Sequence, residues 1–430
     1  MSSPSDRSLT LCTAPRVSEV ASDEWDALGD DEGYPFTRHA FLVALEEEGC
    51  VGESVGWIPC HLLAYSKDRQ DRDDRLVGAM PLYIKTHSQG EFVFDWNWAE
   101  AWDRYGMAYY PKLVSAIPFT PSAGPRLLAH PGADGEAIRS ALVQGAIELA
   151  KRLQASSFHC LFPGERDRDR LEEEGLLLRT GTQFHWENRG YRDFEDFLGS
   201  LTSKRRKEIR RERRDAADAP VSIEIRKGGE TDETHWRAYH SIYASTYDRK
   251  WGYPALSLSF FASVAKAMPE RVLLILARRG DRYIAGAHCF VGDDTLFGRN
   301  WGCLEEHRGL HFEICYYRLI EYCIEHGLDR FDAGAQGEHK LMRGFLPVET
   351  ASAHYIDDPR FREAIRDFLE RERQQQAAYR ELTSRHSPFR ASAPADDAAS
   401  RAVTGTKKQA RSSKSAGGRK MPSRSISNGR

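Results

Sequence analysis

Two spacings of hydrophobic residues alternate along this chain and divide it into strands and helices. In the first half, short runs rich in β-branched and aromatic residues predict strands. These runs are IPCHLLAYS, LVGAMPLYIKT, KLVSAIPFT and SSFHCLF (Ser156–Phe162). Apolar residues three or four positions apart predict helices at Asp23–Leu28, from Thr37 onward and at Gly135–Gln154. Ser22 is placed to cap the first of these helices.

The second half repeats this order of elements. SIEIRK predicts a strand and Glu233–Tyr247 a helix, and three apolar runs then predict an antiparallel meander. These runs are RVLLILARR, AGAHCFVG and TLFGRNWG. A helix at His311–His326 follows, then strands at RFDAG and SAHYI and a charged closing helix at Phe361–Tyr379.

The repeated order predicts an α/β (α+β) fold with two similar domains, each a mixed, mostly antiparallel sheet flanked by helices. A chain of 430 residues suits two domains of ordinary size. We expect a flexible N-terminus (1–14), a first domain (15–195), a basic helical linker (196–218), a second domain with its closing helix (219–379) and a disordered basic tail (380–430).

Composition bears on the compartment and on the tail. The chain has no apolar run of bilayer length and no apolar signal core at its start, so we expect a cytosolic protein. The eight cysteines include no CxxC pair, which favours free thiols.

The net charge of −3 is divided unevenly along the chain. Residues 391–430 hold nine Lys/Arg and two Asp, a charge of +7, so residues 1–390 carry a charge of −10. Such a tail buries too little apolar surface to fold, and its role is open.

The stretch from Phe297 to Phe345 carries the best candidates for chemistry. Its loop GAQGEHKLMRGF gathers Gln336, Glu338, His339, Lys340 and Arg343 within eight positions. Sites collect on loops in this way, whereas a solvated loop whose glycines only permit a tight turn is the plainer interpretation.

Transfer of an acyl group to an amine needs a base and donors for the developing oxyanion. Glu338, His339 and Glu313 are candidate bases, and Gln336 is a candidate oxyanion donor. Lys340 and Arg343 are candidates to bind a phosphate or carboxylate. Glu313 also lies in the first turn of the predicted helix, where a carboxylate stabilises the helix without any catalytic role.

Aromatic residues near this stretch suggest a substrate groove. Arg299 and Trp301 alternate in a predicted strand, so we expect both on one face, with Asn300 on the other. Tyr317 lies off the apolar stripe of its helix and is a further candidate for substrate binding. Trp96, in the first domain, either lines the groove or packs in a core with neighbouring aromatics.

Metal binding is not expected. Cys303, His307, His311 and Cys315 recur every four residues. This is not the ligand spacing of known zinc modules, and the first two lie in a predicted turn, where helical periodicity has no meaning.

The predicted linker helix carries eight Lys/Arg residues between Lys204 and Arg214, with Glu208 and Glu212 among them. A solvated helix with internal ion pairs would explain part of this charge. The excess of positive charge also suits a polyanion, either tRNA or a lipid-linked phosphate.

Several blocks resemble the FemAB-like family of the Gcn5-related (acyl-CoA) N-acyltransferase superfamily. They include FVFDWNWAEAW, YYPKLVSAIPFTP, GPRLL, QFHWEN, KRRKEIRRER, LHFEICYY and GAQGEHKLMRGFLP, and the resemblance covers about residues 15–370. It implies tandem acyltransferase domains and transfer of an acyl or aminoacyl group to an amine. The implied donor is aminoacyl-tRNA, as in relatives that build peptidoglycan bridges, or acyl-coenzyme A, as in ordinary superfamily members.

One departure from that pattern bears on the donor. The turn CLEEHRGLHFE has a single glycine, Gly309, where coenzyme A users carry a glycine-rich pyrophosphate loop. The resemblance as a whole implies an acyltransferase that moves an acyl or aminoacyl group to an amino group, on a cell-wall precursor of the peptidoglycan type. The alternatives are an acetyl-coenzyme A-dependent N-acetyltransferase and a non-catalytic protein that binds a cell-wall precursor or RNA. Donor, acceptor and oligomeric state stay open.

Overall fold

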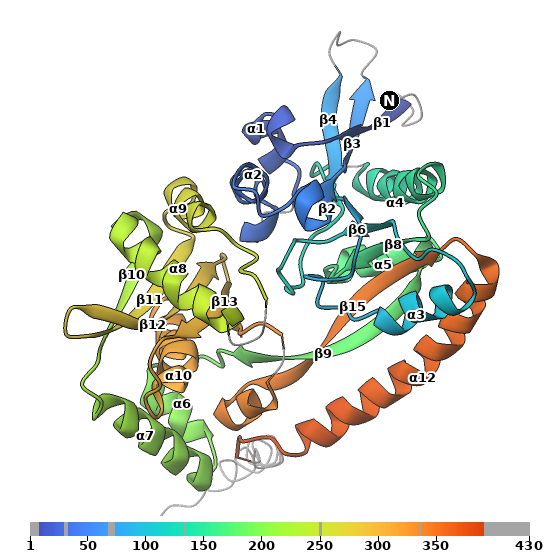
Figure 1. Cartoon of the computed structure of the whole chain (residues 1–430). Helices are drawn as coiled ribbons and strands as arrows, with labels where there is room; N and C mark the ends of the chain where they lie inside the picture. The colour runs from blue at the N-terminus through green and yellow to red at the C-terminus, as the bar shows by residue number, and fades with distance from the viewer. Residues whose placement is uncertain are drawn as a thin grey trace, which may run out of the picture. The chain divides into compact units, whose positions relative to one another are not determined.

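Eleven strands of the described residues form one mixed sheet that runs through both halves of the chain (Figure 1). The computed structural model describes residues 8–29, 33–67, 74–132, 134–248, 252–335 and 337–390. In spatial order the strands are β10 (Ser222–Lys227), β11 (Val272–Arg279), β12 (Arg282–Val291), β13 (Thr295–Cys303), β14 (Arg330–Asp332), β9 (Leu177–Glu187), β15 (Leu346–Ile356), β8 (Ser157–Leu161), β6 (Lys112–Ser115), β5 (Tyr83–Lys85) and β2 (Trp57–Pro59).

The central strands join the two halves. β15, from the end of the second half, pairs antiparallel with β8 and β9 of the first, and β14 also pairs with β9. Neighbouring strands are antiparallel except for β13–β14 and β6–β8, which are parallel. The predicted fold class, a mixed and mostly antiparallel α/β structure, is confirmed.

A smaller sheet lies at the start of the chain. It contains β1 (Ser8–Ala14), β3 (His61–Lys67), β4 (Arg75–Met80) and β7 (Leu128–Ala129) in the order β1-β3-β4-β7. β1 lies in residues that were expected to be flexible, and it is held by pairing with β3. Two predicted strands are each divided into two. The first is divided after Pro59, the last residue of β2, and the second at Pro81, which donates no ladder hydrogen bond.

Helices cover the sheet, and their apolar sides form four cores. Two of these cores lie on opposite faces of β11, because Leu274 and Leu276 belong to one and Leu273 and Ile275 to the other. The helices are α1 (Ser22–Asp26), α2 (His39–Glu47), α3 (Trp96–Arg104), α4 (Gly135–Arg152), α5 (Glu165–Glu173), α6 (Phe194–Ser200), α7 (Ser203–Ala217), α8 (Glu233–Asp248), α9 (Leu258–Ala267), α10 (Leu310–Phe312), α11 (Arg318–Glu325) and α12 (Pro359–Ser384).

Two helices differ from their predictions. The helix expected at His311–His326 is interrupted by a π-helical segment, η5 (Glu313–Tyr317), between α10 and α11. α12 continues past Tyr379 into residues expected to be disordered and lies alongside β9 and β15 (Figure 1). The rest of the predicted tail, residues 391–430, lies outside the described residues.

No helix of the described ranges combines the length and the apolar character that crossing a bilayer requires.

Candidate active site

A cavity of about 330 Å³ opens where two parallel strands separate. β13 and β14 pair from Thr295–Arg330 to Phe297–Asp332, and the cavity begins with the residues that follow on both strands. It is closed by α10, η5 and the loop after β14. The lining residues are Ala287, His288, Cys289, Gly298, Arg299, Asn300, Trp301, His311, Cys315, Tyr316, Leu319, Ala333, Ala335, Gly337, His339 and Lys340.

A β-bulge in β13 interrupts the alternation of side-chain directions along the strand at Arg299. Cys289 pairs with Gly298 and His288 with Asn300, so Arg299 is the extra residue. Its Nη2 donates to the Phe119 carbonyl at 2.8 Å, whereas Trp301 packs edge-on against His311 with ring centroids 4.9 Å apart. The expectation that Arg299 and Trp301 share a face apart from Asn300 is therefore wrong. All three line the cavity, because the bulge breaks the two-residue alternation.

Histidine and lysine from the loop after β14 face this cavity. His339 lies on the short helix η6 (Glu338–Arg343), and its Nε2 lies 2.9 Å from the hydroxyl oxygen of Tyr316. Lys340 is buried, and its ammonium donates to the carbonyls of Ala333 at 2.9 Å and Gly334 at 2.7 Å. An ammonium has three N–H donors, so one is left for a ligand.

Desolvation makes these groups less cationic than usual, although His339 is exposed and Lys340 is buried. Desolvation, reinforced by the nearby charges of Arg343 and Lys340, lowers the pKa of His339. Desolvation first, and then His339, lowers the pKa of His311 to about 4. The pKa of Lys340 falls to about 8, again mainly through desolvation. At neutral pH the cavity thus presents neutral imidazoles beside a charged ammonium.

Three predicted site residues instead hold the scaffold behind the cavity. The buried carboxylate of Glu313 is bound by Arg213 at 3.0 Å and by Arg318 at 2.9 Å, so its proton-accepting oxygens are occupied. Tyr317 is fully buried and donates to Glu212. Arg343 bonds the same Glu212 at 2.8 Å. These contacts join α7 to η5 and η6. The charged groups of Glu313 and Arg343 therefore have a structural role that requires no substrate.

The remaining predicted site residues lie elsewhere. Glu338 is exposed and accepts a hydrogen bond from the Tyr379 hydroxyl of α12 at 2.8 Å, outside the cavity lining. Trp96 is exposed on α3, while Trp98 and Trp102 of the same helix pack inside. Gln336 lies outside the described residues. Of the predicted residues, the structure brings Arg299, Trp301, His339 and Lys340 together.

Sequence reasoning missed His311 and Tyr316 as cavity residues. They lie five positions apart, a spacing that an α-helix places on different sides. The π-helical turn between them brings their ring centroids within 5.6 Å. Such single-turn π segments occur often at functional sites, but the sequence carried no signal for this one.

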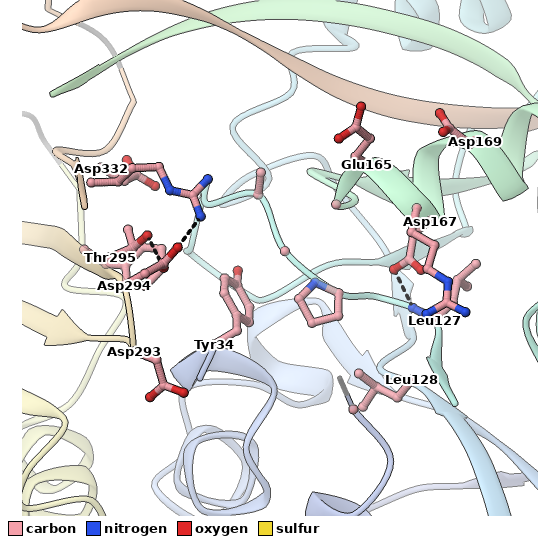
Figure 2. A pocket seen from close by; sticks show the side chains of 18 of the residues that line it. Tyr34, Leu127, Leu128, Glu165, Asp167, Asp169, Asp293, Asp294, Thr295 and Asp332 are labelled. Carbon is pink, nitrogen blue, oxygen red and sulfur yellow. Dashed lines mark hydrogen bonds and ion pairs between the residues drawn. The ribbon is translucent and has the colours of Figure 1, made fainter. Parts of the chain in front are cut away.

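A larger cavity, of about 880 Å³, is lined by carboxylates on two sides (Figure 2). Its buried acids already have partners. Asp167 accepts from the backbone N–H groups of Arg126 and Leu127, and Asp332 accepts from that of Gly334. At its rim, Asp294 pairs with Arg330 at 2.7 Å. These acids stabilise loops and strand ends, so size alone does not make this cavity the reaction site.

In the described part of the chain, no three His, Cys, Asp or Glu side chains are placed to hold a metal ion. Cys315 and His311 line the cavity, and the ring of His339 lies near that of His311, with centroids 6.1 Å apart.

The fold and the cavity define a class of protein. The cavity between the diverging strands carries imidazoles, an ammonium and a guanidinium on its walls. Residues 16–391 match the FemAB-like family, described as peptidoglycan biosynthesis/recognition, and the chain belongs to that family. The predicted family is confirmed by this match.

Solved structures with a similar fold include FemX, a tandem GNAT protein and an L-PGS. FemX is 13% identical, with a TM-score of 0.48 over 81% of this chain and 98% of its own. A tandem GNAT protein from the clavulanic acid biosynthesis pathway is 12% identical, with a TM-score of 0.42 over 82% and 99%. The L-PGS of Bacillus licheniformis is 10% identical, with a TM-score of 0.44 over 80% and 98%. No curated protein matches this chain.

Proposed function

We propose that this FemAB-like protein transfers an acyl or aminoacyl group from an activated donor to an amino group of a cell-wall precursor, and that the reaction takes place in the cavity between β13 and β14. The observation that carries the proposal is that a neutral imidazole, His339, and the buried ammonium of Lys340 line one cavity. Such a pair supplies a base and a fixed cation at the same place.

The chemistry assigns one role to each group. The acceptor amine attacks the carbonyl carbon of the donor ester or thioester and loses its proton to His339. The ammonium of Lys340 stabilises the negative charge that develops on the carbonyl oxygen. The C–O or C–S bond of the donor then breaks, and the proton on His339 passes to the leaving group. Tyr316, bonded to Nε2 of His339, fixes the orientation of the imidazole.

Helix α7 favours aminoacyl-tRNA as the donor. Lys204, Lys207, Arg211 and Arg214 are exposed at spacings of three and four, so they lie along one side of the helix. They form no ion pair with described residues, whereas Arg205, Arg210 and Arg213 are paired with acids. An unneutralised basic stripe of this kind supports binding to a nucleic-acid backbone. A cytosolic location, where charged tRNA is available, stays a prediction.

The turn before α10 supports the same choice. Gly309 is its only glycine, and it begins a helix of three residues. Glu305, in the same turn, accepts a hydrogen bond from Arg279 at 2.9 Å. Coenzyme A is therefore the weaker candidate.

A turnover assay with purified protein tests the proposal. Charged tRNA and acyl-coenzyme A esters are offered as donors, and an amine-bearing cell-wall precursor as acceptor. We expect transfer from charged tRNA, and a loss of about 100-fold or more in kcat for His339→Ala. Glu338→Ala, a change of the adjacent residue outside the cavity, is the control and should stay within about twofold. Normal turnover by His339→Ala would overturn the assignment.

A further inference from the structure

A second cavity, of about 420 Å³, meets the first at the loop after β14. β9 and β15 form one side, α12 another, and the loop before α3 the third. Ala335 lines both cavities, so a ligand in the second cavity can reach the groups of the first. The remaining lining residues are Phe92, Val93, Phe94, Phe162, Arg179, Thr180, Gly181, Thr182, Gln183, Thr350, Ala351, Ser352, Glu372, Gln376 and Tyr379.

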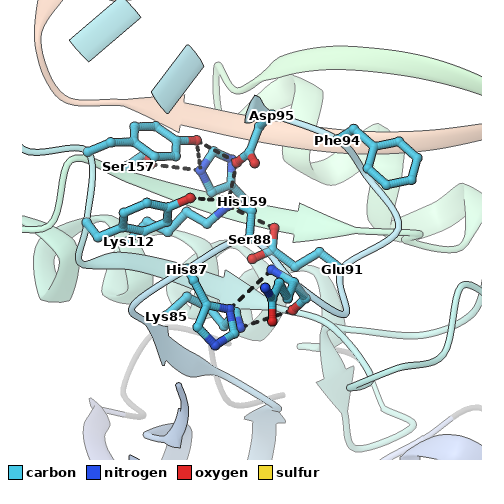
Figure 3. A network of polar contacts seen from close by, with 12 residues as sticks. Lys85, His87, Ser88, Glu91, Phe94, Asp95, Lys112, Ser157 and His159 are labelled. Carbon is cyan, nitrogen blue, oxygen red and sulfur yellow. Dashed lines mark hydrogen bonds and ion pairs between the residues drawn. The ribbon is translucent and has the colours of Figure 1, made fainter. Parts of the chain in front are cut away.

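A buried lysine holds the loop that forms the third side (Figure 3). Lys112 of β6 is fully buried, and its ammonium donates to Ser88 and Glu91 at 2.8 Å each and also to Asp95. All three partners belong to this loop. Buried charges in such a cluster are costly to separate, so the loop is fixed to the sheet.

The same loop presents aromatic rings to the outside. Phe92 and Phe94 are 41% and 56% exposed, and Figure 3 shows Phe94 pointing away from the Lys112 network. Phe92 has a φ of 61°, in the left-handed region that bulky residues rarely adopt. Strained residues of this kind are concentrated at ligand-binding and active sites.

The polar lining of the second cavity has no charge to offer a ligand. Arg179 and Glu372 are bonded to each other by two hydrogen bonds of 2.7 and 2.8 Å, and Arg179 also donates to the Phe94 carbonyl. The other polar groups are hydroxyls and amides. Among them, the buried Thr180 hydroxyl has no hydrogen-bond partner among the described residues. The ligand that fits is therefore uncharged and rich in hydroxyl or amide groups.

Two further observations narrow the ligand class. β9 and β15 are paired with each other along the cavity, so a peptide cannot bind there by adding a strand. Exposed aromatic rings beside neutral hydrogen-bonding groups suit a sugar ring, whose C–H face packs on an aromatic ring while its hydroxyls are bonded at the edge.

We infer that the second cavity binds an uncharged saccharide portion of the acceptor, stacked on Phe92 and Phe94. This inference rests on the proposed function, because it assigns the cationic first cavity to the anionic donor and the uncharged second cavity to the acceptor. The acceptor amine would then reach His339 past Ala335.

Binding measurements on the full chain test the inference without any turnover. Calorimetry and saturation-transfer NMR are run with maltotriose and with tri-N-acetylchitotriose, at up to about 10 mM. We expect the wild type to bind at least one of them, and Phe92→Ala/Phe94→Ala to bind about tenfold more weakly. Tyr105→Ala and Leu382→Ala, which remove exposed apolar side chains outside the cavity lining, serve as controls and should bind as the wild type does.

Several outcomes would overturn the site. They are an absence of saccharide binding by the wild type, equal binding by the double variant, and equal kcat/KM for acceptors with and without a saccharide. Failure of the proposed function would look different. Saccharide binding that is lost in Phe92→Ala/Phe94→Ala, together with no acyl transfer from any donor, would refute the transferase activity and support the site.

Discussion

Burial and bonded partners, more than residue type, distinguish the polar side chains between His311 and Arg343. Glu313 and His339 were both candidate bases. Two guanidinium groups occupy the Glu313 carboxylate, whereas His339 lies at a cavity and bonds a single hydroxyl. The same contrast separates Arg343, which bonds Glu212, from Lys340, which keeps a donor for a ligand. A residue already neutralised by the scaffold has little left for chemistry.

The pKa values of His339 and Lys340 predict a bell-shaped pH profile of kcat/KM. The base must be neutral, so activity should rise with pH through a pKa below 6.5, the ordinary value that burial lowers for His339. Lys340 must be charged, so activity should fall as pH rises through about 8. Lys340→Arg should move the alkaline limb upward, since a guanidinium stays charged.

The control for this profile is His339→Gln, which should have low activity and no acid limb. An unchanged acid limb in His339→Gln, or an alkaline limb that stays in place in Lys340→Arg, would contradict the assignment of the two groups.

At the scale of elements, two irregularities place the candidate site. The bulge in β13 turns Arg299 toward the first half of the chain, and the π-helical turn η5 brings His311 beside Tyr316. Regular elements would have separated these side chains. Bulges and π-helical turns are concentrated near functional sites because they aim side chains that regular repeats cannot.

Helix α7 predicts salt-dependent binding to RNA. Replacing Lys204, Lys207, Arg211 and Arg214 by alanine should weaken tRNA binding and lower the slope of log K against log salt by about three, because four phosphate contacts are lost. Thermal stability should change little, since all four side chains are exposed. Filter binding at several salt concentrations measures the slope.

A charge-matched control removes four exposed cations from other elements: Lys151, Arg152, Lys266 and Arg282. A slope that falls equally in both variants would point to general electrostatic attraction and count against a site on α7.

At the scale of the whole molecule, the sheet joins the halves that the sequence divides into two domains. β15 pairs with β8 and β9, so hydrogen bonds of the first half depend on a strand from the second. The described chain through Phe389 forms one compact unit. Two independently folding domains, with the boundaries expected from the order of elements, stay a prediction.

Expressing the halves separately tests this dependence. Residues 1–218 alone would leave β8 and β9 without β15, and unpaired sheet edges aggregate. We expect the fragment to be insoluble alone and to be recovered when residues 219–430 are co-expressed. A monomeric 1–218 fragment with a cooperative thermal transition near that of the full chain would contradict the expectation.

The sequence by itself determined the elements that depend on local periodicity. The sequence predicted the meander of the second half and the long helix after Gly135, because spacings of two and of three to four residues reflect local geometry. It also predicted the family, from the blocks that resemble it. It also located the loop that holds His339 and Lys340. Only the tertiary structure decided which charged side chains form ion pairs within the scaffold. Glu313, Tyr317 and Arg343 each bond a residue of α7 that lies 100 to 131 positions away in the chain. Pairing across such distances leaves no trace in local spacing.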